Sequence, residues 1–161
     1  MPLDERLLRV ARTRGHTPAA ERAVARFSML GEHAGVWLLL GAVESRLSAG
    51  EQRTRWRRAT TVVAGTYAAN TALKLLVRRV RPELADLPPL TSTPTRYSFP
   101  SAHSSTSFAA ALAYSRAGLP ALPLYALAKG LALSRLYLGV HYPSDVLAGA
   151  LFGTAIAAAA Q

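Results

Sequence analysis

The chain has 161 residues, of which half are apolar and only 17% are charged, so it is long enough for one domain with a sizeable core. Its 19 basic residues outnumber its 9 acidic ones, and the net charge of +10 fits nucleic acid, an anionic membrane or a phosphorylated substrate. The lack of cysteine excludes disulfides and thiolate metal sites, and the first residues lack the apolar centre of a cleavable signal peptide.

The N-terminal segment, residues 1–27, is rich in arginine and has a weak amphipathic pattern. This composition predicts a solvated or interfacial helix. The rest of the chain, residues 28–161, predicts a helical core. We therefore expect one domain over residues 1–161, with a basic N-terminal segment attached to it.

The first part of the core alternates between apolar and polar stretches. Residues 27–43 are apolar apart from Glu32 and His33, and residues 45–58 are polar and predict a linker. A helix is expected over residues 59–81, where Pro82 stops it, because proline lacks the amide donor and clashes with the preceding turn.

The second part predicts one loop and three helices. Residues 83–99 contain three prolines among serines and threonines, which is typical of a loop. Helices are expected over residues 101–116, 122–138 and 145–160, separated by glycine and proline. The predicted fold is all-α, a helical bundle with about five membrane-embedded helices and one N-terminal amphipathic helix.

Membrane embedding is favoured because several helices are apolar nearly all round, and because glycine and alanine dominate residues 147–160. A membrane span needs about 20 mainly apolar residues. The charge-free runs at residues 59–73 and 146–161 are shorter. A buried core in a soluble protein is therefore the alternative.

Three polar clusters interrupt this apolar background. In the first, Lys74, Arg78 and Arg81 would share one face of the predicted helix, with Arg79 on another face. Like charges on one stripe repel each other, so an anion among them would stabilise the helix. Taken alone, the cluster would suit a basic stripe that meets lipid headgroups.

The second cluster opens a helix. Ser101 occupies the expected N-cap position, and the backbone amides of Ala102 and His103 would be free to bind an anion. Without the other clusters, His103 would be interpreted as a surface histidine near a helix start.

In the third cluster, Arg135 can clamp phosphate oxygens with two parallel donors. His141 is a candidate nucleophile, and Asp145 is a candidate acceptor for its second ring nitrogen. Asp145 would also suit the cap of the last helix. Ser134 is interpreted as a packing residue.

Together the segments KLLVRRVRP (74–82), PSAH (100–103) and SRLYLGVHYPSD (134–145) resemble the three-part signature of the type-2 phosphatidic acid phosphatase superfamily. The spacings are Lys, six residues, Arg-Pro; then Pro-Ser-Gly-His; then Ser-Arg, five residues, His, three residues, Asp. All of them fit. The resemblance covers nearly half of the chain.

The resemblance implies that His141 is the nucleophile, His103 the general acid and Asp145 the partner of His141. It also implies a set of groups that hold the phosphate oxygens, namely Lys74, Arg81, Ser101, Arg135 and the backbone at Ala102 and His103. One departure is Ala102, which stands where the signature has glycine. A methyl group there excludes conformations that only glycine reaches easily, so we expect a tuned pocket with activity retained.

The expected reaction passes through a phosphohistidine and needs no metal or other cofactor. The cationic side chains would stabilise the charge on the phosphate oxygens, as metal ions do in other phosphoryl-transfer enzymes. The expected substrate is a lipid phosphate or diphosphate, with a long isoprenoid carrier as the first choice. Phosphatidic acid and phosphatidylglycerol phosphate are alternatives. The expected location is a bacterial cell membrane, with no nucleic acid as partner.

Three rival interpretations use the same residues differently. Vanadium haloperoxidases resemble this family at the anion site, although they are generally larger and soluble. A soluble acid phosphatase would fit the short apolar runs. A basic helical protein that binds nucleic acid or anionic lipid would explain the net charge, but it would not explain two correctly spaced histidines.

Overall fold

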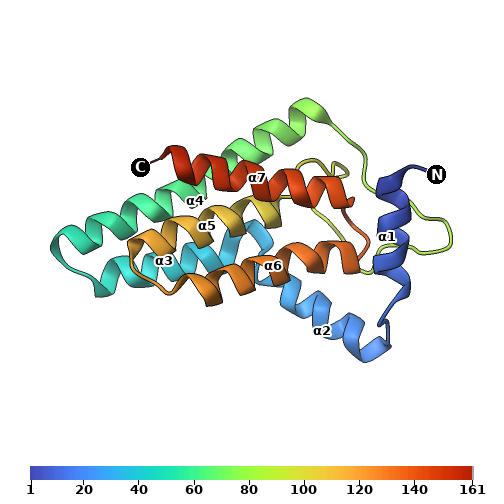
Figure 1. The fold of residues 1–161 in the computed structure, drawn as a ribbon, viewed down its shortest axis with the longest axis horizontal. Coiled ribbons are helices and arrows are strands. Elements are labelled where there is room, and N and C mark those ends of the chain that lie inside the picture. Colours follow the sequence, from blue (N-terminus) through green and yellow to red (C-terminus); the bar gives the residue numbers. More distant parts are fainter. Residues whose placement is uncertain (161) are drawn as a thin grey trace.

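The computed structural model describes residues 1–160, which form seven α-helices and one short 3-10 helix (Figure 1). Over this part of the chain no β-strand is present, and the only extended pairing is an isolated bridge between Val80 and Tyr97. The predicted all-α fold is therefore confirmed, while Gln161 lies outside the described residues. The helices are α1 (Leu3–Thr13), α2 (Pro18–Met29), η1 (Glu32–Ala34), α3 (Gly35–Leu47), α4 (Gly50–Val77), α5 (Ala102–Ala117), α6 (Ala121–Tyr137) and α7 (Pro143–Ala159).

Helix α5 is the centre of the bundle and packs against α4, α6 and α7. Its side chains are small and mostly buried, with Ser104–Ser107 in its first half and Ala109–Ala111 in its second. Small side chains let neighbouring helices approach closely. The buried faces of α4, α6 and α7 therefore all pack against α5.

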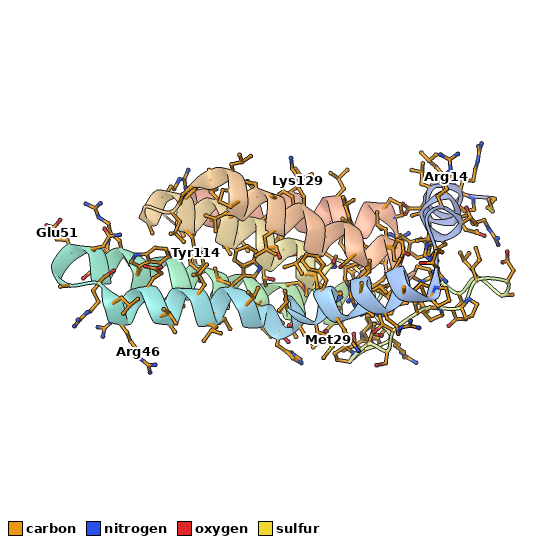
Figure 2. All side chains as sticks on the ribbon, turned by 90° about the horizontal axis from the view of Figure 1, so that it is seen from below. Arg14, Met29, Arg46, Glu51, Tyr114 and Lys129 are labelled. Carbon is orange, nitrogen blue, oxygen red and sulfur yellow. The ribbon has the colours of Figure 1, made fainter. Side chains whose placement is uncertain are left out.

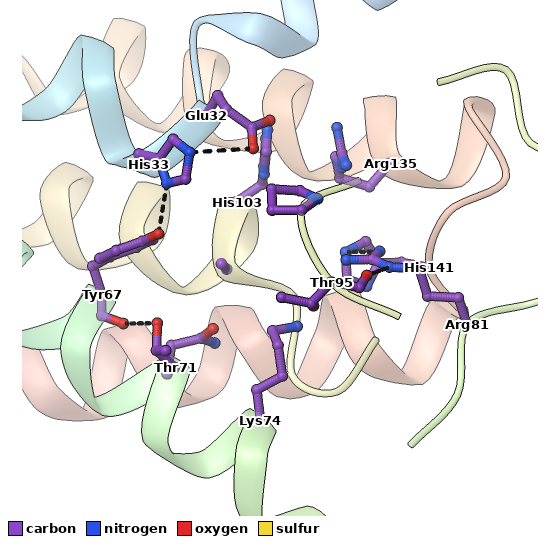
Figure 3. A pocket seen from close by; sticks show the side chains of 13 residues that line it. Glu32, His33, Tyr67, Thr71, Lys74, Arg81, Thr95, His103, Arg135 and His141 are labelled. Carbon is purple, nitrogen blue, oxygen red and sulfur yellow. Dashed lines mark hydrogen bonds and ion pairs between the residues drawn. The ribbon is translucent and has the colours of Figure 1, made fainter. Parts of the chain in front are cut away.

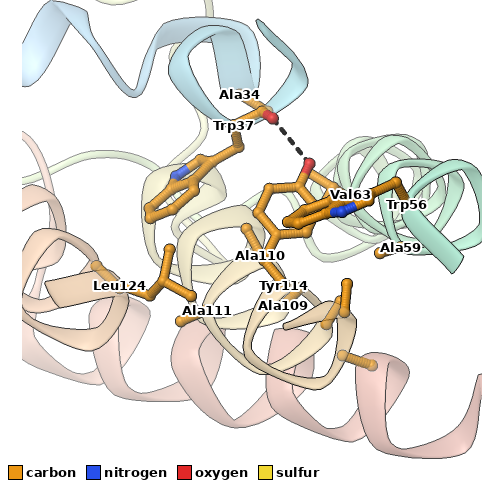
Figure 4. Close-up of a cluster of buried hydrophobic side chains, with 14 of the residues drawn as sticks. Ala34, Trp37, Trp56, Ala59, Val63, Ala109, Ala110, Ala111, Tyr114 and Leu124 are labelled. Carbon is orange, nitrogen blue, oxygen red and sulfur yellow. Dashed lines mark hydrogen bonds between the residues drawn. The ribbon is translucent and has the colours of Figure 1, made fainter. Parts of the chain in front are cut away.

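An aromatic cluster holds the middle of the bundle (Figure 4). The ring of Tyr114 lies 5.2 Å from that of Trp56 and 6.3 Å from that of Trp37, centroid to centroid. Its hydroxyl donates to the carbonyl of Trp37 at 2.7 Å, and the indole of Trp37 donates to Ser107 Oγ at 2.9 Å. The polar atoms of Tyr114 and Trp37 thus both have partners, so neither side chain leaves an unpaired group in the cluster.

The contact between α5 and α7 depends on two glycines of α7. A Cβ atom at Gly149 would lie 2.6 Å from the carbonyl oxygen of Ser101, and one at Gly153 would clash with the backbone of Ser105. The two glycines are four residues apart and share one face of the helix. They bring the middle of α7 against the start of α5.

Helix α1 lies across the end of the bundle where α6 passes into α7 (Figure 1). Buried Arg12 donates to the carbonyls of Pro88 and Tyr137, at 2.7 and 3.1 Å. Arg9 forms an ion pair with Asp86 at 2.6 Å. Figure 2 shows Arg14 at this end and Glu51, in the first turn of α4, at the opposite end.

The helix boundaries differ from the predictions at three places. Residues 50–58 belong to α4 instead of a linker, because arginine is a good helix former and Trp56 turns into the core. Helix α4 also ends at Val77, where Arg78 adopts a left-handed conformation with φ of 55°. The N-terminal segment contains two helices, α1 and α2, where its sequence indicated one.

Within residues 1–160, no helix combines the length and the apolar character that a membrane crossing requires. Large apolar side chains are nevertheless exposed along the outside of the bundle. Leu76 of α4 and Leu122 of α6 are 79% and 83% exposed, and the same holds to a lesser degree for Leu39, Leu133, Leu147 and Leu151.

Candidate active site

A small pocket of about 100 Å³ opens where α4, α5, the 3-10 helix η1 and the turn between α6 and α7 come together (Figure 3). Its wall contains residues from all three sequence clusters, together with others from η1 and α4. From the clusters it has Lys74, Arg81, Ala102, His103, Arg135 and His141. The volume suits a phosphate group and a small adjoining moiety, and is below the usual range of about 300–1,000 Å³ for sites that enclose a whole ligand.

His141 lies in the turn before α7, with its two ring nitrogens in different surroundings. Arg81 Nη1 lies 3.0 Å from Nε2. A guanidinium can only donate, so Nε2 is the acceptor and the proton of the neutral ring is on Nδ1. Asp145 Oδ2 lies 3.6 Å from Nδ1, slightly beyond hydrogen-bond length. The lone pair of Nε2 is therefore on the pocket side and the carboxylate is behind the ring.

Burial lowers the pKa of His141 well below its ordinary value, and the nearby cations, of which Arg81 is the first, lower it further. The ring is therefore neutral near pH 7, which a nitrogen nucleophile requires. Burial also lowers the pKa of Arg81, to about 10, so its guanidinium is still charged at that pH.

Asp145 is fully buried and fixed by three contacts. Its Oδ2 accepts from the backbone N–H of Tyr142 at 2.8 Å, in a capping box that starts α7. Its Oδ1 accepts from Arg79 Nη1 at 2.8 Å, and its backbone oxygen accepts from the N–H of Ser101 at 3.0 Å. The predicted cap and the predicted proximity to His141 are thus both present.

Arg79 is a site residue that the sequence interpretation missed. It was assigned to an outer helix face, but α4 ends before it and its side chain turns toward α7. Besides Asp145, it contacts Ser144 Oγ at 2.7 Å and Asp4 Oδ2 of α1 at 2.7 Å. Arg78, which was placed in the cationic stripe, is exposed, and its Nε donates to the carbonyl of Leu75 at 2.8 Å.

Lys74 and Arg81 reach the pocket from different elements instead of one helical stripe. Lys74 is on the last turns of α4 and donates to the carbonyls of Tyr97, Ser98 and Pro100 at 3.0–3.2 Å. These bonds use all three of its donors. Lys74 therefore fixes the segment that leads into α5, while it also brings positive charge to the pocket. Arg81 is in the loop and donates to two carbonyls as well as to His141.

Ser101 is the residue before α5, as predicted, but its hydroxyl does not cap the helix. Its Oγ is fully buried, and within residues 1–160 it has no hydrogen-bond partner. Ala102 is the first residue of α5 and has no positive φ, so an alanine fits without strain where the family signature has glycine. The first amides of a helix have no intrahelical partner.

His103 and Arg135 meet at Ser28, near the end of α2. His103 Nε2 lies 3.0 Å from the carbonyl oxygen of Ser28, so this nitrogen donates. Arg135 Nη1 donates to Ser28 Oγ at 2.6 Å, and its buried Nε has no partner among the residues described. Ser134 also contacts Ser28, in agreement with its predicted packing role. A bound anion could accept hydrogen bonds from unpaired buried donors of this kind.

The sequence matches a family model. Residues 56–160, more than half of the chain, match the model of the PAP2 superfamily. The matched range includes the three clusters and most of the pocket wall.

Curated relatives agree. The chain is 42% identical over 132 residues to a decaprenylphosphoryl-5-phosphoribose phosphatase of Mycobacterium tuberculosis, which covers 81% of this chain and 73% of that protein. It is 43% identical over 132 residues to the protein of the same name from Mycolicibacterium smegmatis, with 80% and 68% covered.

Solved structures share the fold. LpxE of Aquifex aeolicus superposes with a TM-score of 0.82 at 24% identity, over 99% of this chain and 95% of that one. A transmembrane PAP2-type phosphatidylglycerolphosphate phosphatase of Bacillus subtilis gives a TM-score of 0.78 at 23% identity, over 98% and 82%. The family model and the curated relatives confirm both the family and the enzyme class expected from the three clusters, a phosphatase: the chain belongs to the PAP2 superfamily.

Proposed function

We propose that this chain is a single-domain, metal-independent lipid phosphatase that works through a phosphohistidine on His141. The observation that carries the proposal is the arrangement around that ring, with a guanidinium at Nε2 and a fixed carboxylate at Nδ1. A buried, neutral imidazole between cations is a nucleophile aimed into an anion-binding pocket.

In the first step, Nε2 of His141 attacks phosphorus and the bond from phosphorus to the leaving oxygen breaks. His103 gives its proton to that oxygen, and Asp145 stabilises the positive charge that develops on the ring of His141. Arg81 must release Nε2 and turn its donors to a phosphate oxygen. Because Nε2 of His103 donates to the carbonyl of Ser28, the proton that His103 gives up is a second one on Nδ1, so the ring acts as an imidazolium when the phosphate is bound. Burial lowers the pKa of His103 to about 3 in the free protein, and the bound anion must raise it.

In the second step, water attacks the phosphorus of the phosphohistidine and the P–N bond breaks. His103 takes the proton of the water, and inorganic phosphate leaves while His141 regains its lone pair. Arg81, Arg135 and Lys74 bring three positive charges to the oxygens, and Ser101 with the first amides of α5 adds neutral donors. Such preorganised donors stabilise the transition state because they need no reorganisation during the reaction.

We further propose that the substrate is a phosphate ester on a polyprenyl-linked lipid, the substrate class in the names of the mycobacterial relatives. The small pocket supports this, because it has room for the phosphate end only and leaves a long chain outside. The exposed leucines on the outer faces of α4, α6 and α7 support a membrane setting for that chain. We therefore propose that the protein is embedded in a bacterial cell membrane.

The test is phosphate release from a panel of lipid phosphates by the full chain in detergent, with and without EDTA. We expect activity that survives the chelator, is inhibited by vanadate and is abolished in His141→Ala. Labelled substrate should give an acid-labile phosphoenzyme in the unchanged protein and none in His141→Ala. Substitution of His16, which stacks on Tyr137 outside the pocket, serves as the matched control. Persistent turnover in His141→Ala would refute the nucleophile.

A further inference from the structure

The pocket has two chemically different ends (Figure 3). At one end lie the cations and His141 described above. At the other end lie His33, Tyr67 and Thr71, from η1 and α4. Glu32 of η1 lies between the two ends, beside His103 and Arg135. Glu32 and His33 are the two polar residues that interrupt the apolar stretch 27–43, and the proposed mechanism gives neither of them a task.

The second end is rich in hydrogen-bonding groups. His33 Nδ1 and the hydroxyl of Tyr67 are 2.7 Å apart, which links η1 to α4 across the pocket. The carboxylate of Glu32 is 3.9 Å from His33 Nε2, too far for a hydrogen bond, and it is partly exposed to the pocket. The wall thus offers a charged acceptor and a phenol close together.

The backbone that carries this wall is held in a costly conformation. His33 and Ala34 have positive φ values of 49° and 59°, in a region that residues other than glycine seldom adopt. Such conformations persist where the surrounding structure fixes them, often at functional sites. Gly31 lies directly against the ring of His103, where a Cβ would come within 2.6 Å of it. The wall is therefore adjacent to the proposed general acid.

Charge decides what this end can accept. A carboxylate beside the scissile phosphate repels a second phosphate, and it accepts strong hydrogen bonds from hydroxyl groups. We infer that Glu32, His33 and Tyr67 form a hydroxyl-binding subsite, which selects substrates whose scissile phosphate is esterified to a neutral polyol such as a pentose. This inference rests on the proposed phosphatase function and names the group next to the phosphate.

The subsite separates the candidate lipids. A polyprenyl-linked sugar phosphate presents hydroxyls to Glu32, whereas a polyprenyl diphosphate presents a second anion. Diacylglycerol phosphate presents esters without a donor. Of these three, only the sugar phosphate would donate hydrogen bonds to the groups of this wall.

The test compares two soluble esters of equal carbon number, ribose 5-phosphate and n-pentyl phosphate, which differ in their hydroxyl groups. The full chain in detergent should prefer the ribose ester in kcat/KM. In Glu32→Gln the ratio of the two kcat/KM values should fall about tenfold, since a charged hydrogen bond is replaced by a neutral one. In Tyr67→Phe it should fall roughly threefold. Hydrolysis of farnesyl diphosphate should rise in Glu32→Gln.

Glu51→Gln is the matched control, since Glu51 lies at the far end of the bundle (Figure 2), and its ratio should equal that of the unchanged protein. Equal activity on the two esters, or the same ratio in Glu32→Gln, would overturn the subsite while the phosphatase stands. If the chain releases phosphate from neither ester and from no lipid phosphate, the proposed function is refuted, and the subsite with it.

Discussion

At the scale of single residues, the central feature of the site is the ring of His141, which is neutral and held in one tautomer although several cations surround it. Arg81 donates to the lone pair of His141 Nε2 and so fixes the tautomer, while the carboxylate of Asp145 lies 3.6 Å from Nδ1, where it would stabilise the positive charge in the proposed mechanism. Burial and the cations act in the same direction, because both disfavour the imidazolium. His141, the proposed nucleophile, is thus unprotonated before a substrate arrives.

We predict that His141 remains neutral in the free enzyme at pH 6, below the ordinary pKa of histidine. A lowered pKa means that the neutral form persists as the pH falls, and protonation sets in only below the usual range. Bound phosphate or vanadate should raise this pKa, because the anion offsets the cations around the ring. The measurement is an NMR titration of ring-labelled histidine, with His141→Ala to assign the signal. Titration of the free enzyme near 6.5 or above would contradict the prediction.

A second prediction separates two adjacent arginines. Arg79→Gln should lower kcat by about tenfold or more, because it removes a charged hydrogen bond from the carboxylate that supports His141. Arg78→Gln removes the same charge one residue earlier from an exposed side chain, and should leave kcat within about twofold. Both variants are assayed on one lipid phosphate in detergent. Equal losses would mean that net charge, not the contact with Asp145, is what matters.

The sequence predicted most of the pocket because the reacting groups sit in motifs whose spacing can be read directly. Lys74, Arg81, His103, Arg135 and His141 all line one pocket. The role of Arg79 could not be predicted, since it depends on where α4 ends. That end is set by the left-handed turn at Arg78, which came before the proline that was expected to stop the helix.

At the scale of elements, the site is made by the close approach of α5 and α7. Helix α5 carries Ser101 and His103 at its start, and α7 carries Asp145 in its first turn. The backbones are joined by the bond from the N–H of Ser101 to the carbonyl of Asp145. Glycines on α7 make this approach possible, so the packing of small residues determines the distance between His103, the proposed acid, and His141, the proposed nucleophile.

We predict that Gly153→Ala destabilises the protein and lowers its activity. The added methyl group would clash with the backbone of Ser105, which cannot move without shifting α5. The expected cost is about 1–3 kcal/mol for overpacking. Gly65→Ala on α4 is the matched control, because nothing lies within 4 Å of its new Cβ and alanine is the better helix former by roughly 0.5–1 kcal/mol. The midpoint temperature of thermal unfolding in detergent should fall for Gly153→Ala and rise for Gly65→Ala.

Element boundaries were predictable where glycine and proline mark them, as for α6 and α7, and not elsewhere. The run of arginines before residue 59 was interpreted as a linker, yet it forms the first turns of α4 around buried Trp56. Polar composition alone does not end a helix, since long arginine side chains extend from its outer face.

At the scale of the whole molecule, the first helix meets the start of the last helix beside the site. Helix α1 is connected to the start of α7, 140 residues later, through Asp4. Its carboxylate accepts from the backbone N–H of Ser144 at 2.9 Å, from the hydroxyl of Ser144, and from Arg79. Arg79 passes the connection to Asp145, which faces His141. An N-terminal helix without any motif residue is thus linked to His141, the proposed nucleophile, through Arg79 and Asp145.

The last prediction tests this connection with two carboxylates that both tie α1 to neighbouring parts of the fold. Asp4→Asn keeps the size of the side chain and removes its charge, so Arg79 loses a partner and holds Asp145 less firmly. We expect kcat to fall about fivefold, equivalent to about 1 kcal/mol, with little change in KM. Asp86→Asn weakens the exposed pair with Arg9 and should leave kcat unchanged. Equal losses of kcat in Asp4→Asn and Asp86→Asn would mean that α1 matters only through its docking to the rest of the fold. If only Asp4→Asn loses activity, and the double variant Asp4→Asn, Arg79→Gln is no slower than Arg79→Gln alone, the two residues act on Asp145 as one unit, as expected for coupled neighbours.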